Sequence, residues 1–492
     1  MRRLSYPTMV AYGFGQVGEA LMGAGFGTFL LFYYQQIIGV SGTVTATALA
    51  LSLMVDALCD PIVGSLSDKI RTRWGRRHPF IVAAALPLCV GFYCLFNPPA
   101  GLTQAGYFVW LTVFAIITRQ SLTVFHVPHL ALGAEMARDY TQRSTLYSFN
   151  ILFSSLGGAV GTAIAYRAFF PTTQEFDPGL LNPAGYHTFS IAFAVGIFVA
   201  ILVCALGTWH EIPHLLVRAE APGTKSAARA PRASLPRLFV QMVREFRVVF
   251  GNPSFKSVFF GMMLAFLMLS IEGVFGAYMG VHFWGLTTEQ LSLLPFFAVV
   301  GLLGSLLLIV PVTRWLDKKM TLVWCAVIAI LNGNVLVMLR LFAPDWFPAN
   351  GSPLILPLIA LTTFVGSLMG PLIFATLNSM FADIVDEHEL ATGKRQEGIV
   401  FAARSFAVKV TTSVGLIVGG WLLDAIGFPK AARAGTVAAD VLWDLGFIVG
   451  PATSVFVLAG VFMYLGYSLD RDRHAQVVRE LAQRRAEAGH AE

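Results

Sequence analysis

Two aspartates one helical turn apart are the clearest chemical feature of this 492-residue sequence. Asp56 and Asp60 lie in the apolar stretch VDALCDPIVG, with Cys59 between them. On an α-helix these three side chains share one face, and four residues span about 6 Å of rise. Two carboxylates at this spacing repel each other unless a proton or a cation lies between them. The spacing predicts a site for a proton or a small hard cation. A salt bridge to a neighbouring arginine is the structural alternative.

A second apolar stretch, TRQSLTVFHVPH, carries Arg119, Thr123 and His126. Thr123 and His126 are three residues apart and share a helix face. Pro128 leaves a backbone carbonyl without its helical partner, which is tolerated where helices line a cavity. An imidazole titrates near neutral pH and could relay a proton. A histidine packed in a helix core is an equally good interpretation.

Lys409, Glu19 and Glu272 are further ionisable residues within apolar stretches. Lys409 is about twelve residues, or about 18 Å, from either end of its stretch, too deep for its side chain to reach lipid headgroups. It therefore needs a carboxylate partner or an anionic ligand. Glu19 and Glu272 each lie next to a glycine, in the first apolar stretch of the two halves. Either could take up a proton or pair with Lys409 or His126.

Charged residues also gather at the ends of apolar stretches, where we expect them to form gates. The loop at residues 67–77 is expected to contact helix ends and to stabilise an outward-open state through Asp68, Arg73, Arg76 and Arg77. A second group is expected to form a solvated network and consists of Asp383, Asp386, Glu387, His388 and Glu389 with Lys394, Arg395 and Arg404.

The composition indicates that these residues belong to a membrane protein. Hydrophobic residues make up 56% of the chain and the mean hydropathy is +0.68. Charged residues make up 13%, against roughly 25% in ordinary globular chains. A charge at the centre of a transmembrane helix costs at least about 2.5–3.5 kcal/mol, so the ionisable residues above are functional candidates by default. The composition excludes a secreted disulfide scaffold, a disordered chain and a cytosolic enzyme.

Twelve stretches are long and apolar enough to span a bilayer, which takes about 20 residues. They are residues 10–39, 43–67, 79–97, 106–135, 147–172, 186–208, 255–284, 289–313, 320–342, 353–383, 397–424 and 445–467. Basic residues gather in the loop at 68–77, in the connection at 209–252 and in the tail, whereas the loops at 97–104 and 343–352 contain none. The positive-inside rule therefore places both termini in the cytoplasm.

The Ala/Pro/Arg-rich connection reads as a linker between two sets of six helices. We expect an N-terminal bundle at 1–208, a cytoplasmic linker at 209–252, a C-terminal bundle at 253–467 and a cytoplasmic tail at 468–492. A basic turn follows the second helix of each half, SDKIRTRWGRR in one and TRWLDKK in the other. Six helices plus six in a parallel repeat is the plan of major facilitator transporters.

Other functions fit the sequence less well. The net charge of +6 is spread over short loops, so no nucleic-acid partner is expected. The five cysteines lie in apolar stretches without metal-ligand spacing. An intramembrane enzyme should carry a motif such as H-E-x-x-H, but the sequence after His388 continues without the second histidine. A non-transporting sensor, which remains the less favoured alternative, would need more than the 25 residues after residue 467.

The stretch DALCDPIVGSLSDKIRTRWGRRHPF resembles the signature of the glycoside–pentoside–hexuronide:cation symporters, a major facilitator family that includes the melibiose carrier. The stretches YGFGQVGEALMG, FHVPHLALGAEM and FADIVDEHELATGKRQEGIVFAARSFAVKV also agree. The resemblance implies an all-α membrane protein with twelve transmembrane helices in two six-helix bundles. It further implies a cation-coupled secondary transporter of a small-molecule solute. We expect this transporter to lie in the bacterial inner membrane, in contact with membrane lipid, and to act as a monomer. No cofactor is expected beyond the coupling ion.

The resemblance implies that Asp56, Asp60 and Thr123 bind the coupling ion, H⁺ or Na⁺. The family's asparagine between the two aspartates is Cys59 in this chain. Sulfur is a poor ligand for a hard cation, so we expect proton coupling. Lys409 matches the lysine that the family carries on helix 11.

The sugar-binding positions of the family match less well. The two aspartates that bind sugar in the family correspond here to His126 and to Ala20, which lies beside Glu19. The family's stacking aromatic residue corresponds to Leu130. The family's helix 5 arginine falls near Asn150 or Ile151. Because this chain lacks both of these sugar-binding carboxylates, we do not expect a galactoside-like solute. We expect Glu19, His126, Asn150, Glu272 and Lys409 to bind a sugar-like or anionic solute, such as a uronide or an organic acid. A carrier of amphiphiles such as lysolipids is the alternative.

Overall fold

The computed structural model describes residues 4–70, 72–137, 140–215, 249–342, 345–393 and 396–489. Helices account for almost all of these residues, and no strand occurs among them, which confirms the expected all-α class. The chain forms two compact units. Unit 1 consists of residues 1–230, 273–296 and 416–445, and unit 2 consists of residues 231–272, 297–415 and 446–492.

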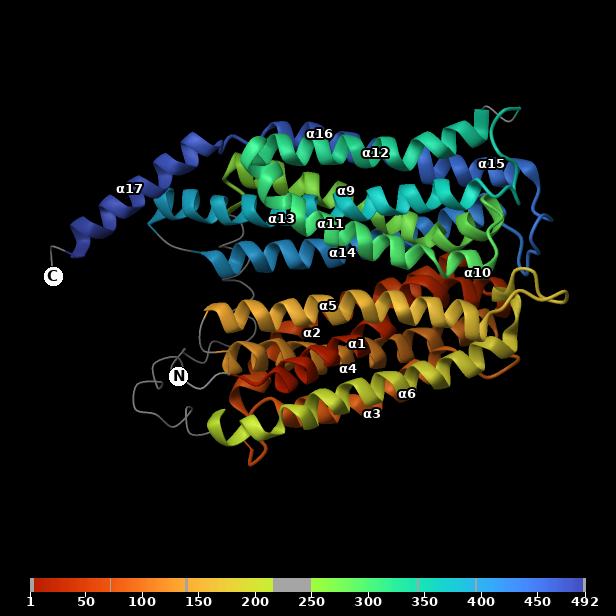
Figure 1. Cartoon of the computed structure of the whole chain (residues 1–492), viewed down its shortest axis with the longest axis horizontal. Coiled ribbons are helices and arrows are strands. Elements are labelled where there is room, and N and C mark those ends of the chain that lie inside the picture. Colours follow the sequence, from red (N-terminus) through yellow and green to blue (C-terminus); the bar gives the residue numbers. More distant parts are fainter. Residues whose placement is uncertain are drawn as a thin grey trace. The chain divides into compact units, whose positions relative to one another are not determined.

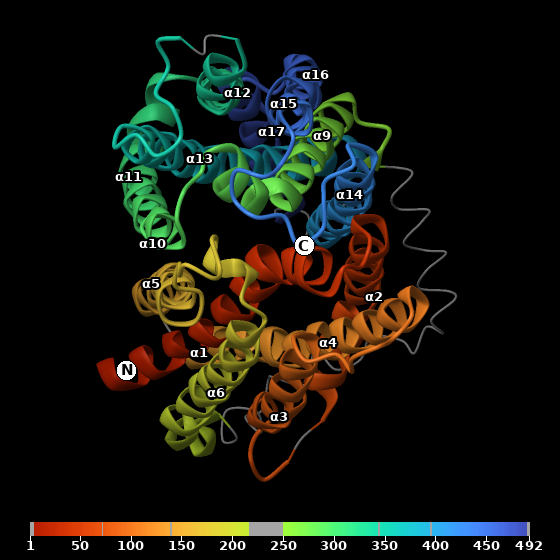
Figure 2. The same cartoon turned by 90° about the vertical axis from the view of Figure 1, so that its right-hand side faces the viewer.

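Six long helices form the first part of unit 1 (Figure 1). They are α1 (Tyr6–Ala24), α2 (Gly42–Lys69), α3 (His78–Leu95), α4 (Gln104–Met136), α5 (Tyr140–Ile164) and α6 (Pro183–Gly207). Ser5, Ser41 and Thr103 begin α1, α2 and α4, because each side chain accepts a hydrogen bond from the backbone N–H three residues later. α4 lies between α2 and α3 and also contacts α1 and α5 (Figure 2).

Several helices continue into π-helical segments. η1 (Gly25–Leu30) and η2 (Tyr33–Ile38) follow α1, η3 (Ala165–Phe169) follows α5, and η7 (Met279–Phe283) follows α9 (Pro253–Tyr278). A π-helical hydrogen bond spans one residue more than an α-helical one. These segments therefore hold more residues per turn than the helices that they extend.

The faces of α2 are chemically opposite. Leu58 and Ile62 are 64% and 54% exposed, while Asp56 is only 8% exposed. Because residues 58 and 62 lie on the far side of the helix from residue 56, α2 presents apolar side chains outward and its carboxylates inward.

Segments from the second half of the sequence complete unit 1. The carboxylate of Asp424, near the end of α14 (Glu397–Ala425), accepts hydrogen bonds from the backbone N–H groups of Gly42 and Thr43, each at 2.8 Å, and from the Thr43 hydroxyl at 2.7 Å. Gly420 leaves no room for a side chain against α2. The Gln36 amide donates to the Pro429 carbonyl at 2.9 Å and accepts from Ala432 N–H at 2.8 Å. We call the contact of Asp424 and Gly420 with the start of α2 the α2–α14 junction.

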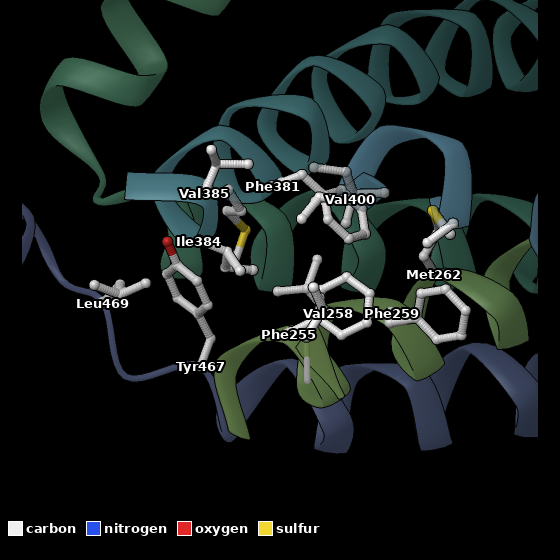
Figure 3. Packing of buried hydrophobic residues seen from close by; sticks show 14 of the residues in the cluster. Phe255, Val258, Phe259, Met262, Phe381, Ile384, Val385, Val400, Tyr467 and Leu469 are labelled. Atoms are coloured by element: carbon white, nitrogen blue, oxygen red, sulfur yellow. The ribbon is translucent and has the colours of Figure 1, made fainter. Parts of the chain in front are cut away.

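Unit 2 is built mainly from the later helices. Besides most of α9 and the first part of α14, it contains α11 (Leu294–Trp315), α12 (Lys318–Phe342), α13 (Ile355–Thr392), α16 (Thr453–Leu465) and α17 (Arg471–Gly489); α15 (Ala439–Phe447) crosses its boundary, and the short α10 (Thr288–Leu291) belongs to unit 1. Figure 3 shows its apolar core, where Phe255, Val258 and Phe259 of α9 pack near Phe381 and Ile384 of α13.

Eleven helices among the described residues are long and apolar enough to cross a membrane, against the twelve spans expected. The segment expected at residues 10–39 is helical from Tyr6 to Ile38 through α1, η1 and η2 but is not among the eleven. Its polar residues lower its hydropathy: Gln16, Glu19, Gln35 and Gln36. Most of the predicted linker, residues 216–248, lies outside the described residues, and the division into bundles at 1–208 and 253–467 stays a prediction.

Candidate coupling and solute site

A buried contact between α1 and α4 fixes the scaffold of the site. The ring of Tyr12 stacks on that of His129 with centroids 4.2 Å apart, and its hydroxyl donates to the His129 carbonyl at 3.0 Å. The amide of Gln16 is hydrogen bonded to His129 Nδ1 at 3.2 Å. Gly133 allows this approach, because any side chain there would collide with Tyr12. The two helices therefore cross with little freedom.

The next polar contact along this crossing joins Glu19 and His126. Glu19 Oε2 and His126 Nδ1 are 2.6 Å apart, and both side chains are about one-third exposed. Among the two glutamates that could pair with His126, the structure selects Glu19. A carboxylate against an imidazole can hold and pass a proton, and it can also bind hydroxyl or anionic groups of a solute.

Thr123 connects the two aspartates of α2. Its hydroxyl donates to Asp56 Oδ1 at 2.5 Å and lies 3.4 Å from Asp60 Oδ1. Asp56 is buried, whereas Asp60 and Cys59 are half-buried on the same helix. The structure thus brings together the three residues expected to bind the coupling ion. Two carboxylates and a hydroxyl suit a proton or a hard cation, while the Cys59 sulfur suits neither.

Arg119 lies one turn from Thr123 on the same face of α4, since four residues separate them. Its guanidinium carbon is 5.0 Å from the ring centroid of Phe26 in η1, and it interacts electrostatically with Asp56. Its Nε is buried and has no hydrogen-bond partner among the described residues.

The face of α4 therefore carries a polar strip. From residue 119 to residue 126, about 10 Å along the helix, it presents Arg119, Thr123 and His126 to the carboxylates of α1 and α2. The strip contains three carboxylates, one fixed cation and one titratable imidazole. When His126 is protonated and the three carboxylates are ionised, the strip has a net charge of −1, so one additional cation makes it neutral.

Lys409 and Glu272 belong to unit 2 and do not meet each other. α9 and α14 run parallel, because Gly415 packs against Ser270 and Gly419 packs against Val274. In this register Lys409 and Glu272 are about 12 Å apart along the helix axes. Lys409 is half-buried, and its carbonyl accepts from the Ser413 hydroxyl. No hydrogen bond or ion pair joins Glu272 to another described residue.

Asn150 lies in α5 and is buried against α1. Its amide nitrogen donates to the Tyr12 hydroxyl at 3.3 Å, and its Oδ1 has no partner among the described residues. Its observed contact supports the scaffold, and its role as a solute ligand stays a prediction.

The basic loop after α2 is tied to α4. Arg77 is buried and donates to Ser67 at 2.7 Å and to Asp68 at 2.5 Å, and it forms an ion pair with Glu135 at 2.9 Å. Arg76 pairs with the same glutamate at 3.1 Å. Arg73 instead stacks over Trp74. Glu135, for which no role was predicted from the sequence, thus holds the loop on α4.

The acidic group near residue 385 is not the solvated network that we expected. The Asp383 side chain is only 7% exposed and pairs with Lys318 at 2.6 Å. His474 of α17 lies between Asp383 and Asp386, at 3.4 and 3.3 Å. The helix α17 covers this group, which explains its burial.

Tyr467 and Arg404 complete the surroundings of this group. The Tyr467 hydroxyl donates to Asp383 at 3.2 Å, and burial beside this carboxylate raises the pKa of Tyr467 well above its ordinary value. Arg404 lies 5.8 Å from the ring centroid of Phe374 instead of against Asp383. Lys394 and Arg395, also expected in this network, lie outside the described residues.

Three structural features went unpredicted for the same reason. The buried contact of Tyr12 with His129, the stacking of Arg119 on Phe26 and the capping of α2 by Asp424 all join residues far apart in the sequence. The sequence does hold a weak signal for Arg119, because a charged residue inside an apolar stretch needs a partner.

The chain is similar to known membrane transport proteins over nearly its whole length. A family described as MFS/sugar transport protein matches residues 11–471. The chain is 25% identical to the inner membrane symporter YicJ of Escherichia coli (strain K12), over 98% of this chain and 95% of that protein. It is 23% identical to the sodium-dependent lysophosphatidylcholine symporter 1-B of Danio rerio, over 96% and 88%. The solved xylose transporter XylE from E. coli, in an inward open conformation, shares the fold with a TM-score of 0.55 and 16% identity, over 94% of this chain and 95% of that one.

Proposed function

Because the chain belongs to the MFS/sugar transport protein family, we propose that it is a cation-coupled symporter that moves a small sugar-like or anionic organic solute by alternating access. It is a multi-pass integral membrane protein with eleven apolar helices of spanning length among the described residues. The similarity to an inner membrane symporter and the basic loops support a bacterial inner membrane with both termini inside.

The observation that carries the proposal is the hydrogen-bonded group Asp56–Thr123–Asp60. A carboxylate pair inside a membrane protein has no structural advantage, because each charge is costly there. A transported cation neutralises it only while bound, which makes the conformational equilibrium depend on the cation. Cys59 contributes no oxygen ligand, so the coupling ion is the proton.

The solute is expected to carry a negative or strongly polar group. Lys409 is a cation deep in α14, and Glu19 and His126 form a polar pair on the other unit. A uronide or an organic acid carries a carboxylate that can bind the Lys409 ammonium group. The similarity to a lysophosphatidylcholine symporter favours an amphiphile as the second candidate.

Uptake into proteoliposomes tests the proposal. Sugars, uronates, organic acids and a lysolipid are offered under an imposed proton gradient in sodium-free buffer, and separately under a sodium gradient at constant pH. Wild-type protein should concentrate one solute class with the proton gradient, and Asp56→Asn and Asp60→Asn should not. A wild type that concentrates solute only with sodium contradicts proton coupling; one that responds to neither gradient contradicts symport.

A further inference from the structure

Arg119 is a half-buried cation, with a buried Nε, for which the proposed function has no use. It lies in the middle of α4 and its guanidinium packs over Phe26, with its Nε unpartnered among the described residues. A cation inside a helix of membrane-spanning length is costly unless a negative charge compensates it. The charge that interacts with it is that of Asp56.

The two aspartates have different neighbours along the strip. α2 and α4 run in the same direction, because their starts are hydrogen bonded to each other: the side chain of Gln104 at the start of α4 accepts from the Ser41 N–H and donates to the Gly39 carbonyl, each at 3.2 Å. Further along both helices, Thr123 meets α2 between Asp56 and Asp60. Arg119 comes one turn before Thr123, so it lies beside Asp56, whereas His126 comes after Thr123 and lies toward Asp60 and Glu19. Asp56 therefore faces a permanent cation, and Asp60 faces a titratable one.

We propose that Arg119 is a built-in counter-cation for Asp56 that makes the coupling site select protons over sodium. This inference rests on the proposed function. With Arg119 in place, the aspartate pair has one net negative charge instead of two. A proton binds covalently to one carboxylate and needs no further ligands. A sodium ion depends on the summed charge and on several oxygen ligands, so it loses more of its binding free energy.

Neutralising Arg119 should therefore change the cation preference. In Arg119→Gln both aspartates are available to sodium, and sodium should bind at least about tenfold more tightly than to the wild type. Arg119→Lys keeps the charge and should behave like the wild type. Binding is measured with the full-length protein in detergent, by sodium-dependent thermal stabilisation at pH 8 with choline as the balancing cation.

Two double variants locate the effect. In Arg119→Gln/Asp60→Asn the gained sodium response should disappear, because only one carboxylate remains. In Arg119→Gln/Asp56→Asn two neutral side chains replace the two opposite charges, and proton-driven uptake should recover at least about tenfold over Asp56→Asn alone, in which the charge of Arg119 is left without that of Asp56.

The outcomes separate this inference from the proposed function. A folded Arg119→Gln variant whose sodium response equals that of the wild type overturns it. If Arg119→Gln does not fold, the charge-neutral Arg119→Gln/Asp56→Asn variant decides: recovered proton-driven uptake supports the inference, and uptake as low as in Asp56→Asn overturns it. A wild type that no cation gradient drives rejects the proposed function itself.

Discussion

At the scale of single residues, the hydroxyl of Thr123 lies within hydrogen-bond distance of both aspartates of α2. Hydrogen bonds to charged groups are worth about 1.5–3 kcal/mol. Thr123→Val keeps the shape of the side chain but not the donor, so coupling-ion affinity should fall about 10–100-fold. Thr123→Ser keeps the hydroxyl and is the matched control. The measurement is the proton dependence of uptake; equal behaviour of the two variants would show that the hydroxyl is not used.

Lys409 provides a second prediction at this scale. Removing one partner of a charged contact costs about 2–5 kcal/mol, so Lys409→Ala should weaken solute binding more than about 30-fold. Lys409→Arg keeps the charge and should bind more tightly than the alanine variant. Binding is measured with labelled solute on monodisperse protein. A Lys409→Ala protein that fails to fold would assign the lysine a structural role.

The sequence could predict which residues of α2 and α4 matter because helical periodicity alone places them on one face. It could not choose between Glu19 and Glu272 as the partner of His126. That choice depends on the crossing of α1 and α4, which Tyr12 and Gly133 fix through contacts more than a hundred residues apart.

At the scale of elements, Asp424 acts as a remote N-terminal cap for α2. It satisfies two backbone N–H groups that the helix cannot satisfy itself. Asp424→Ala should lower the free energy of unfolding by about 0.5–2 kcal/mol, and Asp424→Asn should lower it less, because the amide oxygen still accepts. Thermal unfolding in detergent measures both. Asp440→Ala is the control, since this exposed aspartate accepts from the adjacent Val441 N–H and from no other described residue. A loss as large in the control would refute the capping role.

Element positions were the most predictable part of the structure, because long apolar runs permit little except membrane-length helices. The helix α17 escaped prediction. Its sequence is strongly charged and resembles a solvated tail, but His474 docks it against Asp383 and Asp386, and Arg485 pairs with Glu389 at 2.7 Å.

At the scale of the whole molecule, the basic loop should bias the conformational equilibrium. Arg76 and Arg77 hold the loop on Glu135 of α4. Changing Arg73, Arg76 and Arg77 to Gln removes these pairs, and the population should shift toward an inward-open state. Thiol-reactive labelling of single-cysteine variants from each side of the membrane measures the shift. Arg485→Gln, which breaks a more exposed pair, should leave labelling unchanged; unchanged labelling in the triple variant, or inverted topology, would contradict the prediction.

The composition of the loops predicts the division of the sequence into two halves. It does not predict which segments form each compact unit. Unit 1 recruits residues 273–296 and 416–445 from the second half. The contacts that join these segments to η2 and α2 each involve a backbone group on one side, as at Gly42, Pro429 and Ala432. Backbone groups carry no sequence signature, so hydropathy and motifs could not reveal the α2–α14 junction.

The π-helical segments after α1 determine how the chain tolerates lost residues. Deleting a residue within an α-helix turns everything beyond it by about 100°, whereas η1 holds surplus residues and can absorb a deletion by becoming α-helical. Gly27 in η1 has open space around it. Its deletion should leave measurable uptake, while deletion of Val17 in α1 should abolish uptake by turning Glu19 relative to Tyr12. If both deletions are equally harmful, the surplus is not usable. If they differ, homologous chains can gain or lose residues at η1 without disturbing the polar strip.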